Sequence, residues 1–326
     1  MIHPAISSRF HHLEGITSFA EAFADPEQAA RLGAFMFDPS WPQPPASVTR
    51  ETVAPGPHGP VRLRIYEPAA GGSTRACLVW MHGGAFQAGD LNMPEADWTA
   101  REIAARAGAV VVSVDYRLAV GGVTYPVPLD DVVSALRWAR DAAVELDIDP
   151  GRISVGGASA GGNLAAGAVL RVRDEDGWLP ASLAAVYPAM HAVVPVPDAA
   201  LAAKLAEVPP VLRFLPGDID GINANYLGGA NSRSDGYAMP GQGDLSRLCP
   251  TLVVNAEYDD LRPSGQAFAA SLALGGVDVR QLTAPGTLHG FLNLSASIEP
   301  VGDTLDLLAS LVTGTNLTRP TLQETS

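Results

Sequence analysis

Residues 153–163 read ISVGGASAGGN and place one serine, Ser159, between a short apolar run and a helical pattern. The run Ile153–Val155 predicts a buried strand, and the residues after the serine predict a helix that starts near Asn163. A strand, a sharp turn and a helix form the context in which a Gly-x-Ser-x-Gly turn exposes a nucleophilic serine. The small neighbours of Ser159 let strand and helix pack closely, and the positive helix end favours developing negative charge. A phosphate-binding glycine loop is the alternative, but neither of its usual glycine spacings fits these residues.

The chain around this turn alternates short apolar runs with helical patterns. Such alternation predicts an α/β fold, a mostly parallel sheet with helices on both faces. The segment Val61–Pro68 predicts an early antiparallel strand, because its apolar residues alternate with Arg62 and Arg64. The remaining predicted strands are Cys77–Met81, Val110–Val114, Ile153–Val155, Leu183–Tyr187, Leu252–Asn255 and Val277–Leu282, and the predicted helices are Glu95–Arg106, Val132–Leu146, Asn163–Arg173 and Pro263–Leu274.

Two segments fall outside this alternation. Residues 1–45 hold short amphipathic pieces that end in a proline-rich stretch, and residues 190–245 are rich in Pro and Gly with little helical signal. We expect both segments to lie above the sheet, as additions to a core formed by residues 46–189 and 246–313. The polar tail at residues 314–326 is expected to be flexible.

A nucleophilic serine needs a general base, and the base needs an acid to orient it. With this type of turn, the acid and then the histidine follow the serine along the chain. Only His191 and His289, of the seven histidines, follow Ser159. His289 lies just past the last predicted strand, where a loop can reach the serine, whereas His191 lies in the proline-rich segment. We therefore predict His289 as the base and expect His191 to line the added segment or the surface.

The orienting acid is expected after the predicted strand Leu252–Asn255. Three carboxylates follow it, on Glu257, Asp259 and Asp260. An acidic cluster is usually a solvated face, but its position directly after a buried strand favours a site. We select Asp259, keep Asp260 as the next candidate, and assign Glu257 to the structure of the loop.

A glycine pair predicts the third part of the site. Residues 81–86 read MHGGAF and directly follow the predicted strand Cys77–Met81. Consecutive glycines let backbone N–H groups approach a tetrahedral intermediate without a Cβ in the way. We predict Gly83, Gly84 and Ala160 as the donors of an oxyanion hole, with His82 holding the loop.

Composition narrows the class of protein. The chain has 326 residues, 47% of them hydrophobic, with 35 acidic against 21 basic residues and a formal charge of −14. This balance argues against disorder and against nucleic-acid binding, and leaves small neutral substrates as partners. We find no apolar run long enough to span a membrane and no signal peptide, so a cytoplasmic location is expected. Cys77 and Cys249 are expected to be buried thiols, and no Cys/His spacing implies a metal or a cofactor.

Six motifs occur in order along the chain: HGGAF (82–86), SVDYRL (113–118), PLDD (128–131), GASAGG (157–162), DDLR (259–262) and HGF (289–291). Together they resemble the motifs of the bacterial hormone-sensitive-lipase-like (family IV) carboxylesterases of the α/β-hydrolase superfamily. The resemblance covers about residues 60–312 and implies an α/β-hydrolase fold with a helical cap formed by residues 1–45 and 190–245. It also implies a Ser159–Asp259–His289 triad, activity on short-chain acyl esters of small molecules, and a homodimer formed through the last strand and helix.

Three positions depart from the family pattern. Ala158 stands where the family usually has an acidic residue or Thr, and Asp260 stands where it usually has Pro. Residues 120–124, which read VGGVT, replace a segment that usually contains Pro and Glu. None of these changes removes a predicted catalytic group.

The substrate is not determined by these motifs. A lactonase or a deacetylase acting on a sugar or natural product would use the same residues, and an acyltransferase or a non-catalytic binding protein would be more distant alternatives. Aromatic residues near the motifs are candidates for the substrate pocket, although each one alone is more often a packing residue. These candidates are Phe86, Trp98, Tyr187 and Phe214.

Overall fold

A mostly parallel sheet forms the centre of the computed structural model, which describes residues 1–69, 74–229 and 235–314. Its eight strands lie in the order β1-β2-β4-β3-β5-β6-β7-β8. β2 pairs antiparallel with β1 and β4, and all pairs from β4 to β8 are parallel, which confirms the predicted fold class. The strands are β1 (Val48–Ala54), β2 (Val61–Glu67), β3 (Arg75–Met81), β4 (Val110–Asp115), β5 (Ile148–Ala158), β6 (Ser182–Val186), β7 (Thr251–Tyr258) and β8 (Val279–Leu288).

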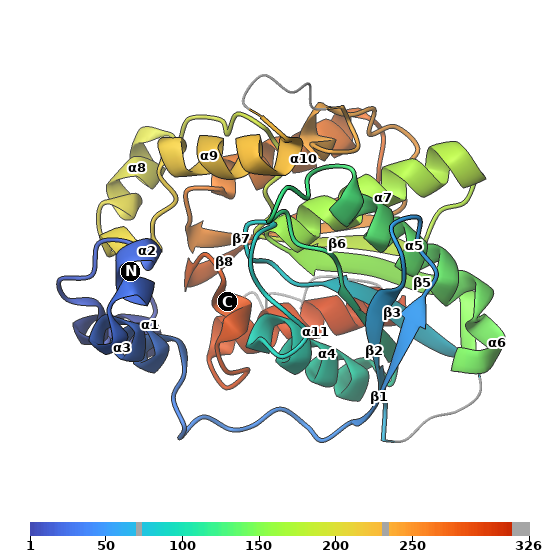
Figure 1. Ribbon diagram of the computed structural model, residues 1–326, viewed down its shortest axis with the longest axis horizontal. Coiled ribbons are helices and arrows are strands. Elements are labelled where there is room, and N and C mark those ends of the chain that lie inside the picture. The colour runs from blue at the N-terminus through green and yellow to red at the C-terminus, as the bar shows by residue number, and fades with distance from the viewer. Residues whose placement is uncertain (70–73, 230–234, 315–326) are drawn as a thin grey trace, which may run out of the picture.

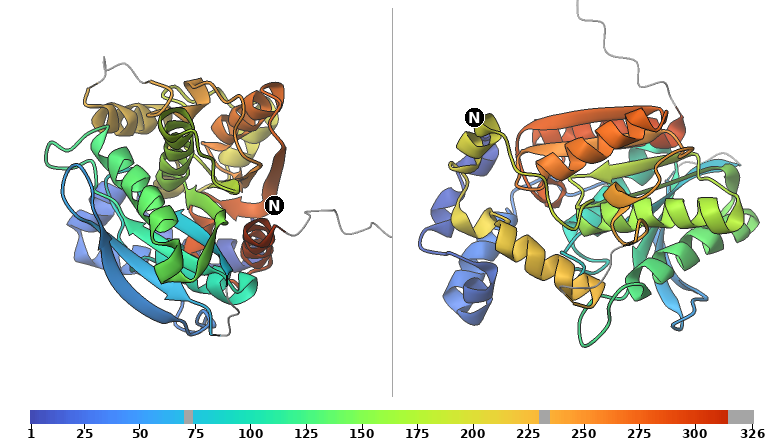
Figure 2. Two further views of the ribbon diagram at one scale, coloured as in Figure 1. Left: turned by 90° about the vertical axis from the view of Figure 1, so that its right-hand side faces the viewer. Right: turned by 90° about the horizontal axis from the view of Figure 1, so that it is seen from above.

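Helices cover both faces of the sheet (Figures 1 and 2). Strand β3 shows the reason, because its side chains alternate between two apolar cores. Cys77 and Val79 pack with α5 and α7 on one face. Leu78 and Trp80 pack with α4 and α11 on the other face. A stretch of strand buried on both faces has to be apolar, as residues 76–81 of β3 are. These helices and their neighbours are α4 (Pro94–Ala107), α5 (Val127–Asp141), α6 (Ala143–Leu146), α7 (Ala160–Asp176), α10 (Arg262–Leu274) and α11 (Glu299–Thr313).

Several elements differ from the sequence prediction: β5 begins at Ile148 and β8 ends at Leu288, outside the predicted bounds, and two further differences have a local cause. The apolar pattern predicted one helix up to Leu146, but α5 ends at Asp141 and α6 begins at Ala143, because Ala142 leaves helical geometry between them. Strand β1 was not predicted: it is an edge strand whose side chains are mostly exposed, so it lacks the apolar run by which the inner strands were recognised.

The two segments outside the alternation, named the cap here, are residues 1–45 and 190–245. Helices α1 to α3 and α8 lie together beyond the ends of β7 and β8, and α9 continues across the top of the sheet (Figures 1 and 2). The second segment is more helical than its Pro and Gly content indicated, because Pro216 opens α9 and the left-handed Gly228 ends it. The cap helices are α1 (Pro4–Ser7), α2 (Phe19–Ala24), α3 (Pro26–Met36), α8 (Ala199–Leu205) and α9 (Pro216–Leu227), with short 3-10 turns at Phe10–Leu13, Pro210–Leu212 and Pro240–Gln242.

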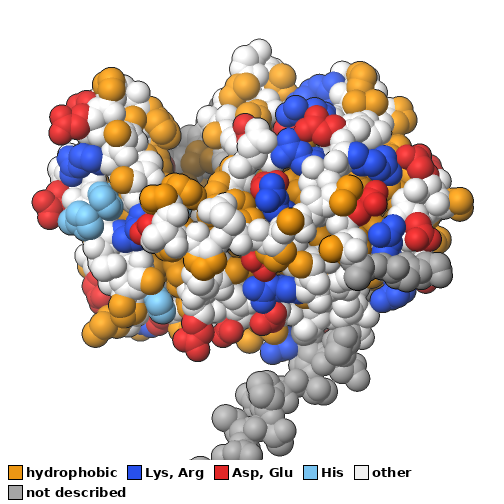
Figure 3. Space-filling model, turned by 90° about the horizontal axis from the view of Figure 1, so that it is seen from below, with side chains coloured by type: hydrophobic (Ala, Val, Ile, Leu, Met, Phe, Trp, Pro, Cys, Tyr) orange, Lys and Arg blue, Asp and Glu red, His pale blue; other side chains and the backbone are white. Residues whose placement is uncertain are grey.

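The surface carries acidic and basic side chains interspersed with one another, as Figure 3 shows for one face. Within the three described ranges, no helix has the length and apolarity needed to cross a membrane. Residues 314–326 were predicted to form a flexible tail. Gly314 is described and ends α11 in a left-handed conformation, and residues 315–326 lie outside the described part of the chain.

Candidate active site

Ser159 occupies the sharp turn between β5 and α7. Its backbone has φ 54° and ψ −118°, an unfavourable conformation for a residue with a side chain, and its N–H donates to Val186 O at 2.8 Å. A Cβ on Gly157 would lie 2.3 Å from Gly161 O, and a Cβ on Gly161 would lie 2.3 Å from Met81 O. Both glycines are therefore required by close backbone contacts, which explains the residue types in the sequence motif.

His289 and Asp259 lie next to this serine. The Nε2 atom of His289 is 2.9 Å from Ser159 Oγ, and its Nδ1 atom is 2.8 Å from Asp259 Oδ2. Asp259 is only 1% exposed, and its second oxygen accepts the N–H of Leu261 at 2.9 Å. The three groups follow β5, β7 and β8, whose carboxyl ends meet at one edge because these strands are parallel.

The electrostatics of the site act mainly on His289. Burial alone would lower the pKa of its imidazole, because burial disfavours the charged form. The charge of Asp259 and its hydrogen bond to Nδ1, followed by the charges of Glu95 and Asp260, outweigh burial and raise the pKa of His289 above its ordinary value. His289 is therefore a stronger base than a free imidazole.

The other two carboxylates of the acidic cluster hold different parts of the structure. Asp260 accepts two hydrogen bonds from Arg213 of the cap at 2.8 Å and the N–H of Phe214 at 3.0 Å. Glu257 pairs with Lys204 of α8 and accepts the N–H of Gly286 at 2.6 Å. Neither carboxylate touches His289, so both connect the loops and the cap around it.

The loop after β3 differs from the expectation at Gly83. Its N–H donates to the buried carboxylate of Glu95, so this N–H is not directed at Ser159. Gly84 and Ala85, with φ of 107° and 54°, line the same cavity as Ser159. Gly84 and Ala85 are therefore the residues of this loop that border the cavity, whereas Gly83 is turned to Glu95. Ala85 was not among the predicted residues of this loop, because glycines were taken as the marker of a close backbone approach.

Two further predicted positions lie close to the serine. Ala160 opens α7, so its N–H has no acceptor within the helix. His82 is fully buried, with its Nδ1 atom 2.6 Å from Gly83 O and its ring stacked on Tyr116. Burial lowers the pKa of His82, which keeps the ring neutral in its loop-supporting position.

A cavity of about 480 Å³ lies between Ser159 and the cap. Its walls are mostly apolar, and none of its lining residues in the described part of the chain is Lys or Arg. Phe214 is the one predicted pocket residue among them, and its ring meets His289 edge-on with 4.7 Å between centroids. The main cap residues of the lining are Ile6, Phe19, Phe23, Phe35, Leu212 and Phe214.

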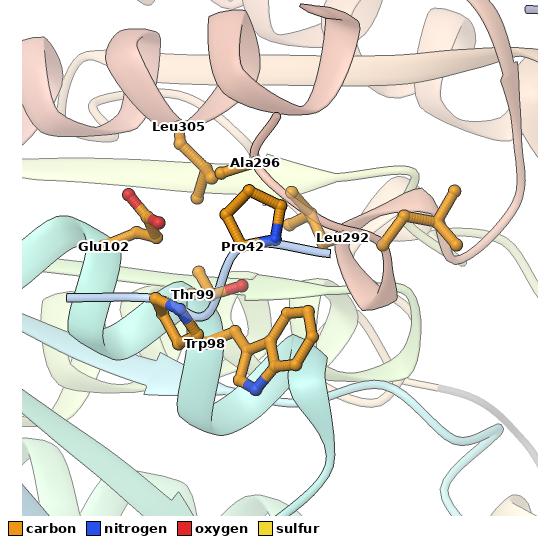
Figure 4. A pocket seen from close by; sticks show the side chains of 9 residues that line it. Pro42, Trp98, Thr99, Glu102, Leu292, Ala296 and Leu305 are labelled. Atoms are coloured by element: carbon orange, nitrogen blue, oxygen red, sulfur yellow. The ribbon is translucent and has the colours of Figure 1, made fainter. Parts of the chain in front are cut away.

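The other three pocket candidates do not line this cavity. Phe86 is fully buried and stacks on Tyr226 of α9, with ring centroids 3.9 Å apart. Tyr187 is buried behind His289 and donates its hydroxyl to Glu95 at 2.6 Å. Trp98 borders a separate recess of about 10 Å³ beside Pro42 (Figure 4), which is too small for a substrate. Each is thus a packing residue, the more frequent outcome for an aromatic side chain.

The site around Ser159 includes neither His191 nor the two cysteines. His191 contacts Ser264 at the start of α10, with its Nδ1 atom 2.8 Å from the hydroxyl. Cys77 and Cys249 are buried free thiols, and burial raises the pKa of each to about 12. Within the residues that the structure describes, no group of His, Cys, Asp and Glu side chains is arranged to hold a metal ion.

The fold and the order of serine, acid and histidine along it define an α/β hydrolase. Comparison with known proteins agrees: the family described as "alpha/beta hydrolase fold" matches residues 78–293. The carboxylesterase NlhH of Mycobacterium tuberculosis is 36% identical over 240 residues, 72% of each chain. The ethyl acetate hydrolase of Pseudomonas putida is 31% identical over 256 residues, 74% of this chain and 75% of that protein.

A solved structure, a hyperthermophilic esterase from the archaeon Pyrobaculum calidifontis, is also similar. It superposes with a TM-score of 0.76 at 32% identity and covers 84% of this chain and 88% of that one. The chain therefore belongs to the α/β-hydrolase family, in its hormone-sensitive-lipase-like branch, and it is an enzyme of the carboxylic ester hydrolase class.

Proposed function

We propose that this protein is a serine carboxylesterase that hydrolyses short-chain acyl esters of small molecules through Ser159, His289 and Asp259. The observation that carries the proposal is a continuous line of contacts. Asp259 Oδ2 is 2.8 Å from His289 Nδ1, and His289 Nε2 is 2.9 Å from Ser159 Oγ. This geometry lets the histidine remove the serine proton while the aspartate keeps the imidazole in the required tautomer.

In the first half-reaction, His289 Nε2 takes the proton of Ser159, and Oγ bonds to the ester carbonyl carbon. The carbonyl oxygen becomes an oxyanion, for which we propose the N–H groups of Gly84, Ala85 and Ala160 as donors. His289 then gives its proton to the alcohol oxygen, the carbon–oxygen bond breaks, and an acyl-serine remains.

In the second half-reaction, water replaces the alcohol. The same His289 Nε2 takes a proton from the water as its oxygen bonds to the acyl carbon. The oxyanion forms again at the same donors, and His289 returns the proton to Ser159 Oγ as the acid leaves. No step requires a metal or a cofactor, since the base and the donors belong to this chain.

The lining of the cavity supports a small, neutral and largely apolar ester. Apolar cap residues form one wall, and no described Lys or Arg is available to bind an anionic substrate. The name of the Pseudomonas putida relative, ethyl acetate hydrolase, supports a short acyl chain. These two observations together point to neutral acetyl to butyryl esters.

The test combines labelling with a substrate panel. A fluorophosphonate probe should label Ser159, located by mass spectrometry of the labelled peptide, and p-nitrophenyl acetate and butyrate should be hydrolysed. The panel also includes longer p-nitrophenyl esters, lactones and acetylated sugars. A higher kcat/KM on lactones or acetylated sugars would replace the simple-ester proposal with a lactonase or a deacetylase. A lack of labelling would contradict the whole mechanism.

We also propose a homodimer formed through the end of the sheet. Strand β8 is the terminal strand, it pairs with β7 alone among the described strands, and its residues 279–283 are partly or fully exposed. An open edge strand can pair with a second copy. Light scattering after size-exclusion chromatography would give the mass of the dimer, and a monomer mass would contradict this proposal.

A further inference from the structure

Glu95, the second residue of α4, has a carboxylate between two loops of the site. Its side chain lies within the protein, only 2% exposed, and borders the catalytic cavity. Its Oε2 atom accepts the N–H of Gly83, and its Oε1 atom accepts the hydroxyl of Tyr187 at 2.6 Å. An ionised carboxylate only accepts hydrogen bonds, so each oxygen has a matching donor.

The backbone of Glu95 is held as firmly as its side chain. Its N–H donates to Asn293 Oδ1 at 3.1 Å, and its carbonyl accepts the indole N–H of Trp80 at 2.9 Å. Trp80 lies on β3, and Asn293 lies four residues after His289. The position of the carboxylate is therefore fixed from β3 and from the loop that follows the base.

The bond to Gly83 controls the direction of the loop after β3. A Cβ on Gly83 would lie 2.6 Å from Glu95 Oε2 and 3.1 Å from Ser159 Cβ, so this residue fits between the carboxylate and the nucleophile. A buried N–H needs an acceptor, and a charged acceptor gives a stronger bond than a neutral one. With Gly83 turned to Glu95, the next two residues, Gly84 and Ala85, border the cavity.

The bond to Tyr187 controls the opposite side of the site. The Tyr187 backbone has φ 36°, and its ring meets the ring of His289 edge-on, with 5.0 Å between centroids. The Tyr187 hydroxyl also lies 3.3 Å from the N–H of Leu292, which donates to it. Tyr187 is thus the wall behind the base, and its hydroxyl is anchored on Glu95.

We propose that Glu95 is a positioning residue for ester hydrolysis, whose carboxylate holds the oxyanion loop and the wall behind His289 in one fixed arrangement. The inference rests on the proposed function, because it assigns a task within that mechanism. Glu95 acts through Gly83 and Tyr187 and takes no proton from the substrate. Displacing catalytic groups by about 1 Å can cost about 10²-fold in rate, so such an anchor matters for kcat.

The charge of Glu95 provides a second readout. Among the described residues, the titratable groups that contact His289 are Asp259 and Tyr187, and the carboxylates of Glu95 and Asp260 act on it by their charge. Burial lowers the pKa of His289, and the charges of Asp259, Glu95 and Asp260 raise it. Removing the charge of Glu95 therefore lowers the pKa of His289, and the acid limb of the pH–rate profile moves to lower pH.

The experiment compares Glu95→Gln with a matched control, Glu102→Gln. Glu102 lies on the same helix, is 9% exposed, and pairs with Arg106 at 2.9 Å beside the recess of Figure 4, away from Ser159. Gln keeps the shape of Glu but removes its charge and one acceptor. We expect Glu95→Gln to lower kcat on p-nitrophenyl butyrate about 10- to 100-fold with little change in KM. We expect its acid limb to move to lower pH, and Glu102→Gln to change neither quantity.

Three outcomes decide the proposal. Wild-type kcat in a folded Glu95→Gln variant would overturn it, as would an equal loss in Glu102→Gln or an unmoved acid limb. If Glu95→Gln does not fold, Tyr187→Phe removes one donor to the carboxylate, and an unchanged kcat in that variant would overturn the proposal instead. Ser159→Ala separates the two hypotheses, because activity that survives Ser159→Ala contradicts the proposed function whatever Glu95 does.

Discussion

The carboxyl ends of β5, β7 and β8 and the cap face each other across one cavity, but they are held in place differently. On the sheet side, Ser159, His289 and Asp259 contact one another directly and are fixed by strand ends and buried polar partners. On the cap side, apolar side chains form the wall, and Phe19 and Phe23 are 40% and 72% exposed at its margin. The difference indicates that changes on the sheet side act on kcat, whereas changes in the cap act on KM and substrate choice.

The largest expected effect is that of Ser159→Ala. Loss of the nucleophile should lower kcat on the order of 10⁵-fold or more. The unfolding temperature should stay close to that of the wild type, because Ala keeps the Cβ and loses only the hydrogen bond between Oγ and His289. Measuring initial rates and thermal unfolding on one preparation checks both statements. Substantial residual turnover would show that the sheet side does not contain the chemistry.

Asp259→Asn should have the next largest effect. An amide at this position no longer holds the imidazole in the required tautomer, and kcat should fall about 10⁴-fold. Asp260→Asn is the matched control, because Asp260 contacts Arg213 and Phe214 and not His289. A larger loss of kcat in Asp260→Asn than in Asp259→Asn would reverse the assignment of the acid.

Activity should fall at acid pH with a midpoint that reflects His289. The base acts when neutral, and the pKa of His289 is raised, against the effect of burial, mainly by Asp259. The kcat/KM profile should therefore lose activity as pH falls through a value above the ordinary histidine value of about 6.5. A profile that stays flat down to pH 4 would contradict a histidine base.

A smaller effect is expected where the cap is anchored. Arg213→Gln removes the charged pair with Asp260 and loosens the segment that carries Phe214. The variant should lose about 1 kcal/mol of the interaction free energy between the cap and the rest of the protein. KM should therefore rise about fivefold, and kcat should stay within about twofold of the wild type. Steady-state kinetics on p-nitrophenyl butyrate separates the two constants. A fall in kcat with unchanged KM would contradict the statement that changes in the cap act on KM and changes on the sheet side act on kcat.

The smallest effect is expected for Phe23→Ala. Phe23 borders the cavity but is 72% exposed, so truncation should change stability by no more than about 0.5 kcal/mol. KM for short esters should change less than about twofold, because short acyl chains do not reach the margin of the cap. A chain-length series gives the check. A large loss on acetate esters would show that the margin contacts the reacting part of the substrate.

The fold could be predicted from the sequence because its main signals are local. The β-branched runs, the helical spacings and the turn around Ser159 each lie within a few residues of one another, and they predicted the parallel sheet correctly. Strand β1 was missed because an exposed edge strand has no apolar run. The order of serine, acid and histidine likewise led to the three residues that the structure brings together.

The rest of the site depends on contacts between residues far apart in the chain. The acceptor of the Gly83 N–H could not be predicted from the glycines, because it is the carboxylate of Glu95, twelve residues later. Phe86 looked like a pocket residue, but Tyr226 of α9 covers it. Glu95 itself resembles an ordinary acid in a first helical turn, and the only signal in the sequence is that it follows Pro94 at the helix start.

The mostly apolar lining of the cavity, which includes no described Lys or Arg, also bears on what happens after hydrolysis. The reaction converts a neutral ester into an alcohol and an acid that ionises at neutral pH. The new carboxylate finds no described Lys or Arg on the cavity wall, and it lies in a space bordered by the carboxylate of Glu95. The net charge of −14 on the chain further disfavours an anion that has left the oxyanion donors. The cavity that admits the ester is thus unfavourable for its acid product, so the wall that selects the substrate also promotes product release.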